Sequence, residues 1–205
     1  MRKLPIYFLV DTSESSLIGK ATDCMDRILC GIRQDPYLLE TAFISIITIG
    51  KNPNIVLPLT DNCIIKSLPR LECEKGVGLG KTLELLIDDI DKNVVKSTIE
   101  RKGDWRPIIF LFINHTPTDE YSTILNQWKL NYGRNTFFSV MSENSANFLK
   151  SISNAILSYD KMKDVAPAII KRIAFYPIEA PICTSQEEEI RHFNTDLNNF
   201  LNREF

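Results

Sequence analysis

The sequence has little of what defines several common protein classes. Its 24 lysines and arginines against 26 aspartates and glutamates leave a formal net charge of −2, which argues against nucleic acid as the main partner. The longest apolar run, residues 108–113, is far shorter than the roughly 18 residues of a membrane-spanning helix. The five cysteines form no Cys-x-x-Cys pair, and the two histidines have no zinc-ligand spacing. Reduced thiols in a cytoplasmic protein without a membrane partner explain these absences.

The composition is that of an ordinary globular protein. Hydrophobic residues make up 44% of the chain and charged residues 24%, and 205 residues can bury a core without disulfides or metal. The length predicts one domain, which we assign to residues 1–183. Ser185 and Glu188 form a capping-box pattern ahead of an apolar periodic stretch. We therefore expect a C-terminal helix at 184–205, packed on the domain or appended to it.

The apolar periodicity predicts strands alternating with helices. We expect strands at 4–10, 41–49, 55–59, 108–113 and 136–140, and helices at 16–32, 79–94, 119–130 and 146–157. The turn at 50–53 places the second and third strands at hairpin distance, and Asp35-Pro36 indicates another turn. This order predicts an α/β fold: a doubly wound, mostly parallel sheet with one antiparallel edge hairpin and helices on both faces.

The first strand is followed directly by a cluster of oxygen-bearing side chains. Asp11, Ser13 and Ser15 alternate along one short loop before a predicted helix. One carboxylate and two hydroxyls are hard ligands of the kind that Mg²⁺ and Mn²⁺ prefer. The same residue types also serve as helix N-caps. Spacing alone leaves both interpretations open, and they are compatible.

Several segments together resemble a known family. Residues 6–15, with the sequence IYFLVDTSES, resemble the opening of a von Willebrand factor A (vWA) domain, whose metal-ion-dependent adhesion site (MIDAS) begins with D-x-S-x-S. Further segments are similar to the bacterial tellurium-resistance Y-type (TerY-like) branch of that family: LPIY at 4–7, DPY at 35–37, LET at 39–41, VLPLT at 56–60 and PTD at 117–119. This resemblance implies the fold predicted above and a metal site of Asp11, Ser13 and Ser15.

The sequence departs from the family at the remaining metal positions. Val77 stands where the family has a threonine ligand, and Asn114 stands where it has an aspartate. His115 replaces a small glycine, and Glu14 stands where glycine is usual. A carboxylate about 5 Å from a divalent ion contributes on the order of 2–7 kcal/mol, so losing one weakens binding. We expect Mg or Mn binding to be weak or absent in the free protein.

The resemblance also implies a function. Domains of this branch are non-catalytic protein-interaction modules that accompany a protein kinase and a PP2C-like phosphatase in a bacterial stress or defence system. Docking would use loops at the carboxyl edge of the sheet. Here these loops contain Glu14, Gly78, His115 and Asp119.

Two other functions stay open. An enzyme acting on phosphoesters or nucleotides would use Asp11, Ser13 and Lys81, with His115 as a general base. Residues 76–82 resemble the end of a phosphate-binding P-loop, but Lys75 stands where that motif needs glycine. The third alternative is a structural subunit that binds through the predicted helix at 184–205.

Overall fold

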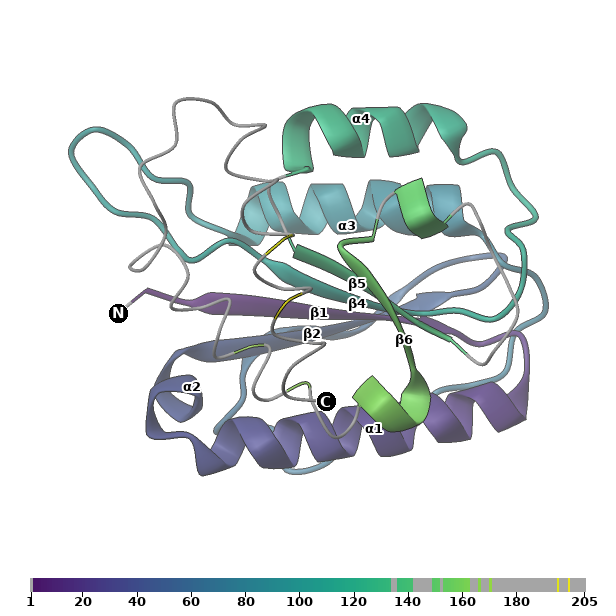
Figure 1. The fold of residues 1–205 in the computed structure, drawn as a ribbon, viewed down its shortest axis with the longest axis horizontal. Coiled ribbons are helices and arrows are strands. Elements are labelled where there is room, and N and C mark those ends of the chain that lie inside the picture. Colours follow the sequence, from purple (N-terminus) through teal and green to yellow (C-terminus); the bar gives the residue numbers. More distant parts are fainter. Residues whose placement is uncertain are drawn as a thin grey trace.

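The computed structural model describes residues 2–133, 136–141, 149–151 and 153–162, with the single positions 166, 170, 195 and 199. These residues form a six-stranded sheet in the order β3-β2-β1-β4-β5-β6 (Figure 1). The strands are β1 (Leu4–Asp11), β2 (Ala42–Ile49), β3 (Ile55–Asp61), β4 (Ile108–Phe112), β5 (Thr136–Met141) and β6 (Ala155–Ser158). The helices are α1 (Ser15–Gln34), α2 (Pro36–Thr41), α3 (Leu79–Asn93) and α4 (Ser122–Tyr132), with a short 3-10 turn η1 (Leu149–Ser151).

Strand β1 lies inside the sheet because residues 4–10 are almost entirely apolar. All of its residues are buried, and it pairs in parallel with β2 on one side and β4 on the other. β4 and β5 also pair in parallel, as do β5 and β6. β3 pairs antiparallel with β2 at the edge. The predicted mostly parallel sheet with one antiparallel edge hairpin is therefore confirmed.

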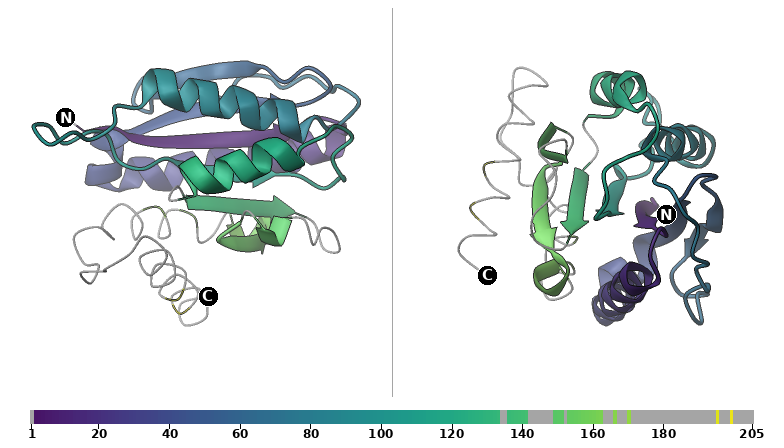
Figure 2. Two further views of the ribbon diagram at one scale, coloured as in Figure 1. Left: turned by 90° about the horizontal axis from the view of Figure 1, so that it is seen from above. Right: turned by 90° about the vertical axis from the view of Figure 1, so that its right-hand side faces the viewer.

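Helices cover both faces of the sheet (Figure 2). α1 buries an apolar stripe, including Leu17, Ala21 and Ile28, at helical spacing, and it packs with α2 on the face that carries the stacked rings of Phe8 and Phe110. α3 and α4 cover the opposite face. The doubly wound arrangement is thus confirmed. Within the described residues, no helix combines the length and apolar character needed to span a bilayer.

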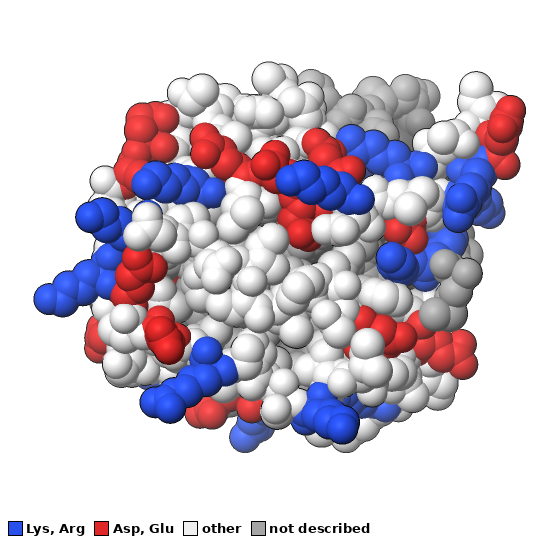
Figure 3. All heavy atoms as spheres, turned by 180° about the vertical axis from the view of Figure 1, so that it is seen from behind, with Lys and Arg blue, Asp and Glu red and all other residues white. Residues whose placement is uncertain are grey.

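Edge strand β3 exposes a largely uncharged surface. Between Ile55 and Thr60 it carries no charged side chain, and Figure 3, which looks onto this side, shows an uncharged centre with charged side chains around it. Pro58 removes one backbone donor from the edge, and the pairing with β2 contains register shifts. Both features disfavour pairing with another strand.

The prediction of a helix at 146–157 is wrong where the structure describes it. Residues 149–151 form the η1 turn, and Ala155–Ser158 form strand β6, parallel to β5. A run of four mostly apolar residues fits a helix and a strand equally well, so periodicity could not decide between them. The free edge of β5 decided, because its backbone groups pair with β6.

The predicted turn at Asp35-Pro36 is the start of a helix. Asp35-Pro36 begins helix α2 instead of forming a simple turn. The Asp35 carboxylate accepts hydrogen bonds from the backbone N of Tyr37 and Leu38, and Pro36 is the first helical residue.

The predicted helix at 184–205 lies outside the described residues, apart from the isolated positions 195 and 199. The proposed domain boundary at 183 lies outside them as well.

One buried polar contact ties β1 to α3. The Tyr7 hydroxyl donates to Asp89 Oδ2 over 2.8 Å, and Asn93 Nδ2 donates to Asp89 Oδ1 over 2.9 Å. Tyr7 is 0% exposed and Asp89 7%. Burial and the adjacent carboxylate raise the pKa of Tyr7 well above its ordinary value. The phenol therefore stays protonated and satisfies an otherwise buried charge.

We expect Tyr7→Phe to lower the free energy of unfolding by about 1.5–3 kcal/mol, because it leaves the Asp89 carboxylate without its phenol partner. Urea denaturation followed by circular dichroism measures this loss. Tyr132→Phe is the matched control, since the Tyr132 hydroxyl donates to Asp91 Oδ2 at the surface, and we expect a change within about 0.5 kcal/mol. Equal losses in both variants would contradict the assignment.

Candidate functional site

The topology creates a site between β1 and β4. From β1 the chain proceeds to β2 on one side, and β4 returns on the other side of β1. The loops that follow β1 and β4 therefore diverge at the carboxyl edge, where open α/β sheets bind ligands. Asp11 ends β1, and Asn114 and His115 follow β4 within three residues of its end. This reversal brings residues about a hundred positions apart into contact.

The Asp11 carboxylate is the buried centre of this site. Its side chain is 1% exposed. Oδ1 accepts from the backbone N of Ser13 over 2.9 Å, and Oδ2 accepts from the backbone N of Asn114 over 3.4 Å. His115 Nδ1 lies 3.3 Å from the same Oδ2. A buried carboxylate needs such donors, and here they come from the loops after both strands.

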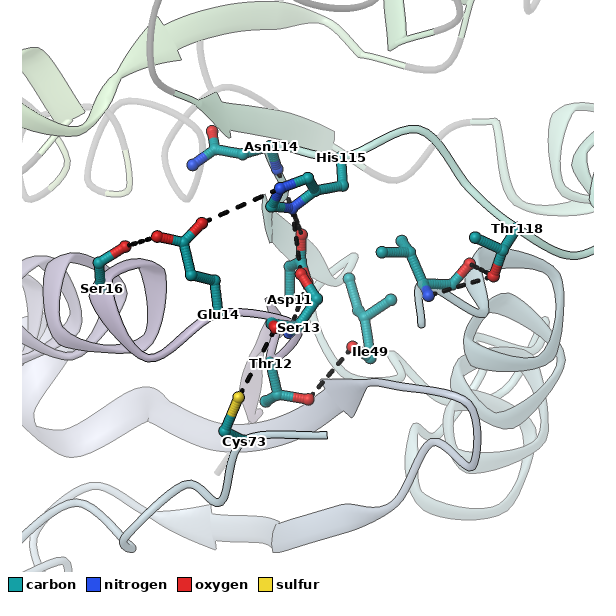
Figure 4. A network of polar contacts seen from close by, with 11 residues as sticks. Asp11, Thr12, Ser13, Glu14, Ser16, Ile49, Cys73, Asn114, His115 and Thr118 are labelled. Atoms are coloured by element: carbon teal, nitrogen blue, oxygen red, sulfur yellow. Dashed lines mark hydrogen bonds and ion pairs between the residues drawn. The ribbon is translucent and has the colours of Figure 1, made fainter. Parts of the chain in front are cut away.

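His115 extends the network toward solvent (Figure 4). Its Nδ1 also lies 3.0 Å from Ser13 Oγ, and its Nε2 lies 4.0 Å from Glu14 Oε2. The other oxygen of Glu14 accepts from the Ser16 hydroxyl. The His115 side chain is 48% exposed and that of Glu14 55%. The outer rim of the site is therefore an imidazole and a carboxylate held by their neighbours.

The helix-cap interpretation of the Asp11–Ser15 loop is not what the structure shows. The N-cap position of α1 is Glu14, and no side chain forms a cap hydrogen bond there. Asp11 instead bonds within its own loop and to the loop after β4. Ser15 is the first residue of α1 and is exposed.

Val77 and Asn114, which stand at metal-ligand positions of the family, make other contacts in this structure. Val77 is 2% exposed and packs in the apolar cluster beneath α3. Its backbone is bonded to Thr118, whose N donates to Val77 O over 2.8 Å. Figure 4 shows the Asn114 side chain pointing away from Asp11, so that only its backbone N faces the carboxylate.

The Gly78 and Asp119 positions form the start of α3. Gly78 is the N-cap and supplies no side-chain hydrogen bond. Asp119, from the loop after β4, compensates by accepting from the backbone N of Lys81 at Oδ2 over 3.1 Å, and its negative charge suits a helix N-terminus. A Cβ at Gly80 would lie 2.3 Å from the carbonyl oxygen of Glu120. Gly80, in the segment that resembles a P-loop, therefore permits close approach of α3 and the loop after β4.

Two residues that fix this edge were not predicted from the sequence. Thr12 is 1% exposed, and both its backbone N and its hydroxyl donate to Ile49 O, over 3.1 and 3.3 Å. Thr118 ties the loop after β4 to Val77 through its backbone and its hydroxyl. No sequence signal separates these two threonines from the other threonines of the chain. Only their position at strand ends could have indicated them.

The donor set does not fit a divalent cation in this arrangement. The Val77 side chain has no oxygen, that of Asn114 points away, and Asp11 Oδ2 already contacts the backbone N of Asn114 and His115 Nδ1. Mg²⁺ requires a near-octahedral shell of oxygens. Ser13 Oγ, which would be a ligand, instead contacts His115.

Comparison with known proteins shows the fold. The sequence matches no family profile and no curated protein. Proximal thread matrix protein 1 from the mussel byssus is similar in structure with a TM-score of 0.58, 14% identity, and coverage of 84% of this chain and 48% of its own. The VWA domain of SpRpn10 is similar with a TM-score of 0.54 and 12% identity, and the match covers 76% of this chain and 87% of that domain. The ArnB paralog VWA2 from Sulfolobus acidocaldarius is similar with a TM-score of 0.53 and 13% identity, and the match covers 83% of this chain and 44% of that protein.

These similarities confirm a vWA-like α/β fold. At such low identity they show the fold alone. The chain spans less than half the length of the mussel and Sulfolobus proteins. Another structure of the mussel protein has a zinc-occupied MIDAS motif, a property of that protein. The resemblance to the tellurium-resistance branch stays a prediction.

We expect Gly80→Ala to destabilise the protein by about 1–3 kcal/mol, because the new methyl group overlaps the Glu120 carbonyl. Gly19→Ala is the matched control. Gly19 lies in the exposed face of α1 with nothing within 4 Å of an added Cβ, so alanine should stabilise the helix by up to about 1 kcal/mol. Thermal denaturation compares the two. A stable Gly80→Ala variant would refute the close-approach explanation.

Proposed function

We propose that this chain is a non-catalytic protein-interaction module that docks through loops at the carboxyl edge of its sheet. The observation that carries the proposal is the Asp11–Ser13–His115–Glu14 network. It holds the loops after β1 and β4 in one arrangement and leaves an imidazole and a carboxylate about half exposed. A pre-organised, partly exposed rim of this kind suits recognition of a folded partner, because few side chains need ordering on binding.

The partner class comes from the resemblance. Domains of the tellurium-resistance Y-type branch accompany a protein kinase and a PP2C-like phosphatase, so we propose these two as cytoplasmic partners in a bacterial stress or defence module. The vWA-like fold supports a role in protein binding. The poor fit of the site to Mg²⁺ or Mn²⁺ favours docking by direct hydrogen bonds and ion pairs over cation bridging.

The geometry around Ser13 argues against the enzymatic alternative. A serine nucleophile needs an adjacent base that can take its proton. His115 Nδ1, the nitrogen nearest Ser13, also contacts the Asp11 carboxylate, which can only accept. A hydrogen bond to Asp11 therefore places the proton on Nδ1 and removes its capacity as a base. Lys81 makes its described contacts with Asp119 and Lys51.

Charge changes on the rim test the proposal. We expect Glu14→Lys, and Thr116→Arg at the exposed position directly after His115, each to weaken binding of the purified kinase or phosphatase at least about tenfold, equivalent to about 1.4 kcal/mol. Biolayer interferometry measures the dissociation constants. Ile99→Arg is the control, because Ile99 is fully exposed in the loop before β4, at the opposite end of the sheet.

Two outcomes would count against this function. If Ile99→Arg weakens binding as much as the rim variants, docking does not use the carboxyl edge. If neither the kinase nor the phosphatase binds the unmodified chain, the proposed partners are wrong.

A further inference from the structure

We infer that the imidazole of His115 takes the place of a divalent cation at the carboxyl edge, so that a side chain holds the loops after β1 and β4 together. His115 Nδ1 lies 3.0 Å from Ser13 Oγ and 3.3 Å from Asp11 Oδ2. Ser13 and Asp11 both belong to the set of residues that would hold a cation bound by the Asp11–Ser15 loop. The inference concerns the architecture of the edge and holds whether or not a partner docks there.

The ring nitrogen already occupies contacts that a bound cation would need. Mg²⁺ holds oxygen ligands at about 2.1 Å. A cation that close to Ser13 Oγ or Asp11 Oδ2 would compete with the ring nitrogen, which already contacts both oxygens (Figure 4). On the far side of the ring, Nε2 faces the Glu14 carboxylate at 4.0 Å. Glu14 is itself held by the Ser16 hydroxyl.

The imidazole can also link the loops after β1 and β4, as a bound cation would. The Asp11 carboxylate is almost fully buried and needs donors from outside its own loop. In the tautomer with the proton on Nδ1, the ring nitrogen supplies one beside the backbone N of Asn114. A glycine at position 115 has no side chain to reach Asp11, and the two loops would then be joined at Asp11 by that long backbone contact.

Two other positions change in the same direction. Val77 is buried in the α3 core, and the Asn114 side chain points away from Asp11. Neither presents an oxygen to the space between Ser13 and Asp11. If the imidazole links the two loops, oxygen ligands at positions 77 and 114 are not needed. The departures at Val77, Asn114 and His115 from the metal-binding pattern then have one explanation.

Calorimetric titration with MgCl₂ and MnCl₂ tests the inference on the chelator-treated full chain. The key comparison is Val77→Thr/Asn114→Asp with and without the added change His115→Gly. We expect no saturable binding at millimolar concentration for the unmodified chain, and at least about tenfold tighter binding for the triple variant than for the double variant. Adding Ser13→Ala to the triple variant should abolish the gain.

Several results would overturn the inference. The first is that the unmodified chain or the double variant binds Mg²⁺ or Mn²⁺ as tightly as the triple variant. The second is that the triple variant folds but binds neither ion more tightly than the double variant. ZnCl₂ is a further probe, because saturable zinc binding that His115→Gly abolishes would make the imidazole a metal ligand instead of a replacement.

A second measurement decides the case even if the triple variant fails to fold. In the absence of metal, His115→Gly should lower the melting temperature by about 2–4 °C more than Thr116→Gly. Both changes add a glycine to the same loop, and only the first removes the imidazole. Equal melting temperatures would show that His115 does not join the loops, and would refute the inference without bearing on partner binding.

Discussion

The arrangement of the carboxyl edge depends on burying the Asp11 carboxylate at the end of the central strand. Its side chain is 1% exposed, and an ionised carboxylate at that depth must be compensated. The donors come from Ser13 in its own loop and from Asn114 and His115 after β4. Satisfying one charge therefore orders two loops that the topology sends in opposite directions. Each hydrogen bond to such a group is worth about 1.5–3 kcal/mol.

The remaining loops are positioned by close backbone approach. Thr12 attaches the end of β1 to the end of β2, and Thr118 attaches the loop after β4 to Val77. Gly80 lets the Glu120 carbonyl reach the start of α3, where Asp119 accepts from the backbone. The glycine-rich segment thus has a packing role, and the acidic residue beside it serves the helix N-terminus. What is left for recognition is the rim formed by Glu14 and His115.

The sequence predicted most of the fold because its strands are long and apolar and its helices strongly periodic. Residues 4–10 and 108–113 read as buried parallel strands and are so in the structure. The failures were short elements. Residues 155–157 were assigned to a helix but belong to β6, which pairs with β5, and Asp35-Pro36 opens α2. In both cases about four to six residues carry too little periodicity to identify an element, and a neighbouring strand or a capping carboxylate decides.

The candidate site divides in the same way. By itself the sequence determined which oxygen-bearing residues follow the first strand, that Val77 and Asn114 lack the groups of a full metal site, and that His115 stands near them in the order of elements. These follow from residue chemistry and from the alternation of strands and helices, both of which are local. Only the tertiary structure decided that Asp11, Ser13 and His115 meet within 3.3 Å, because that contact joins residues more than a hundred positions apart. Strand order places them side by side, and burial of the carboxylate holds them there.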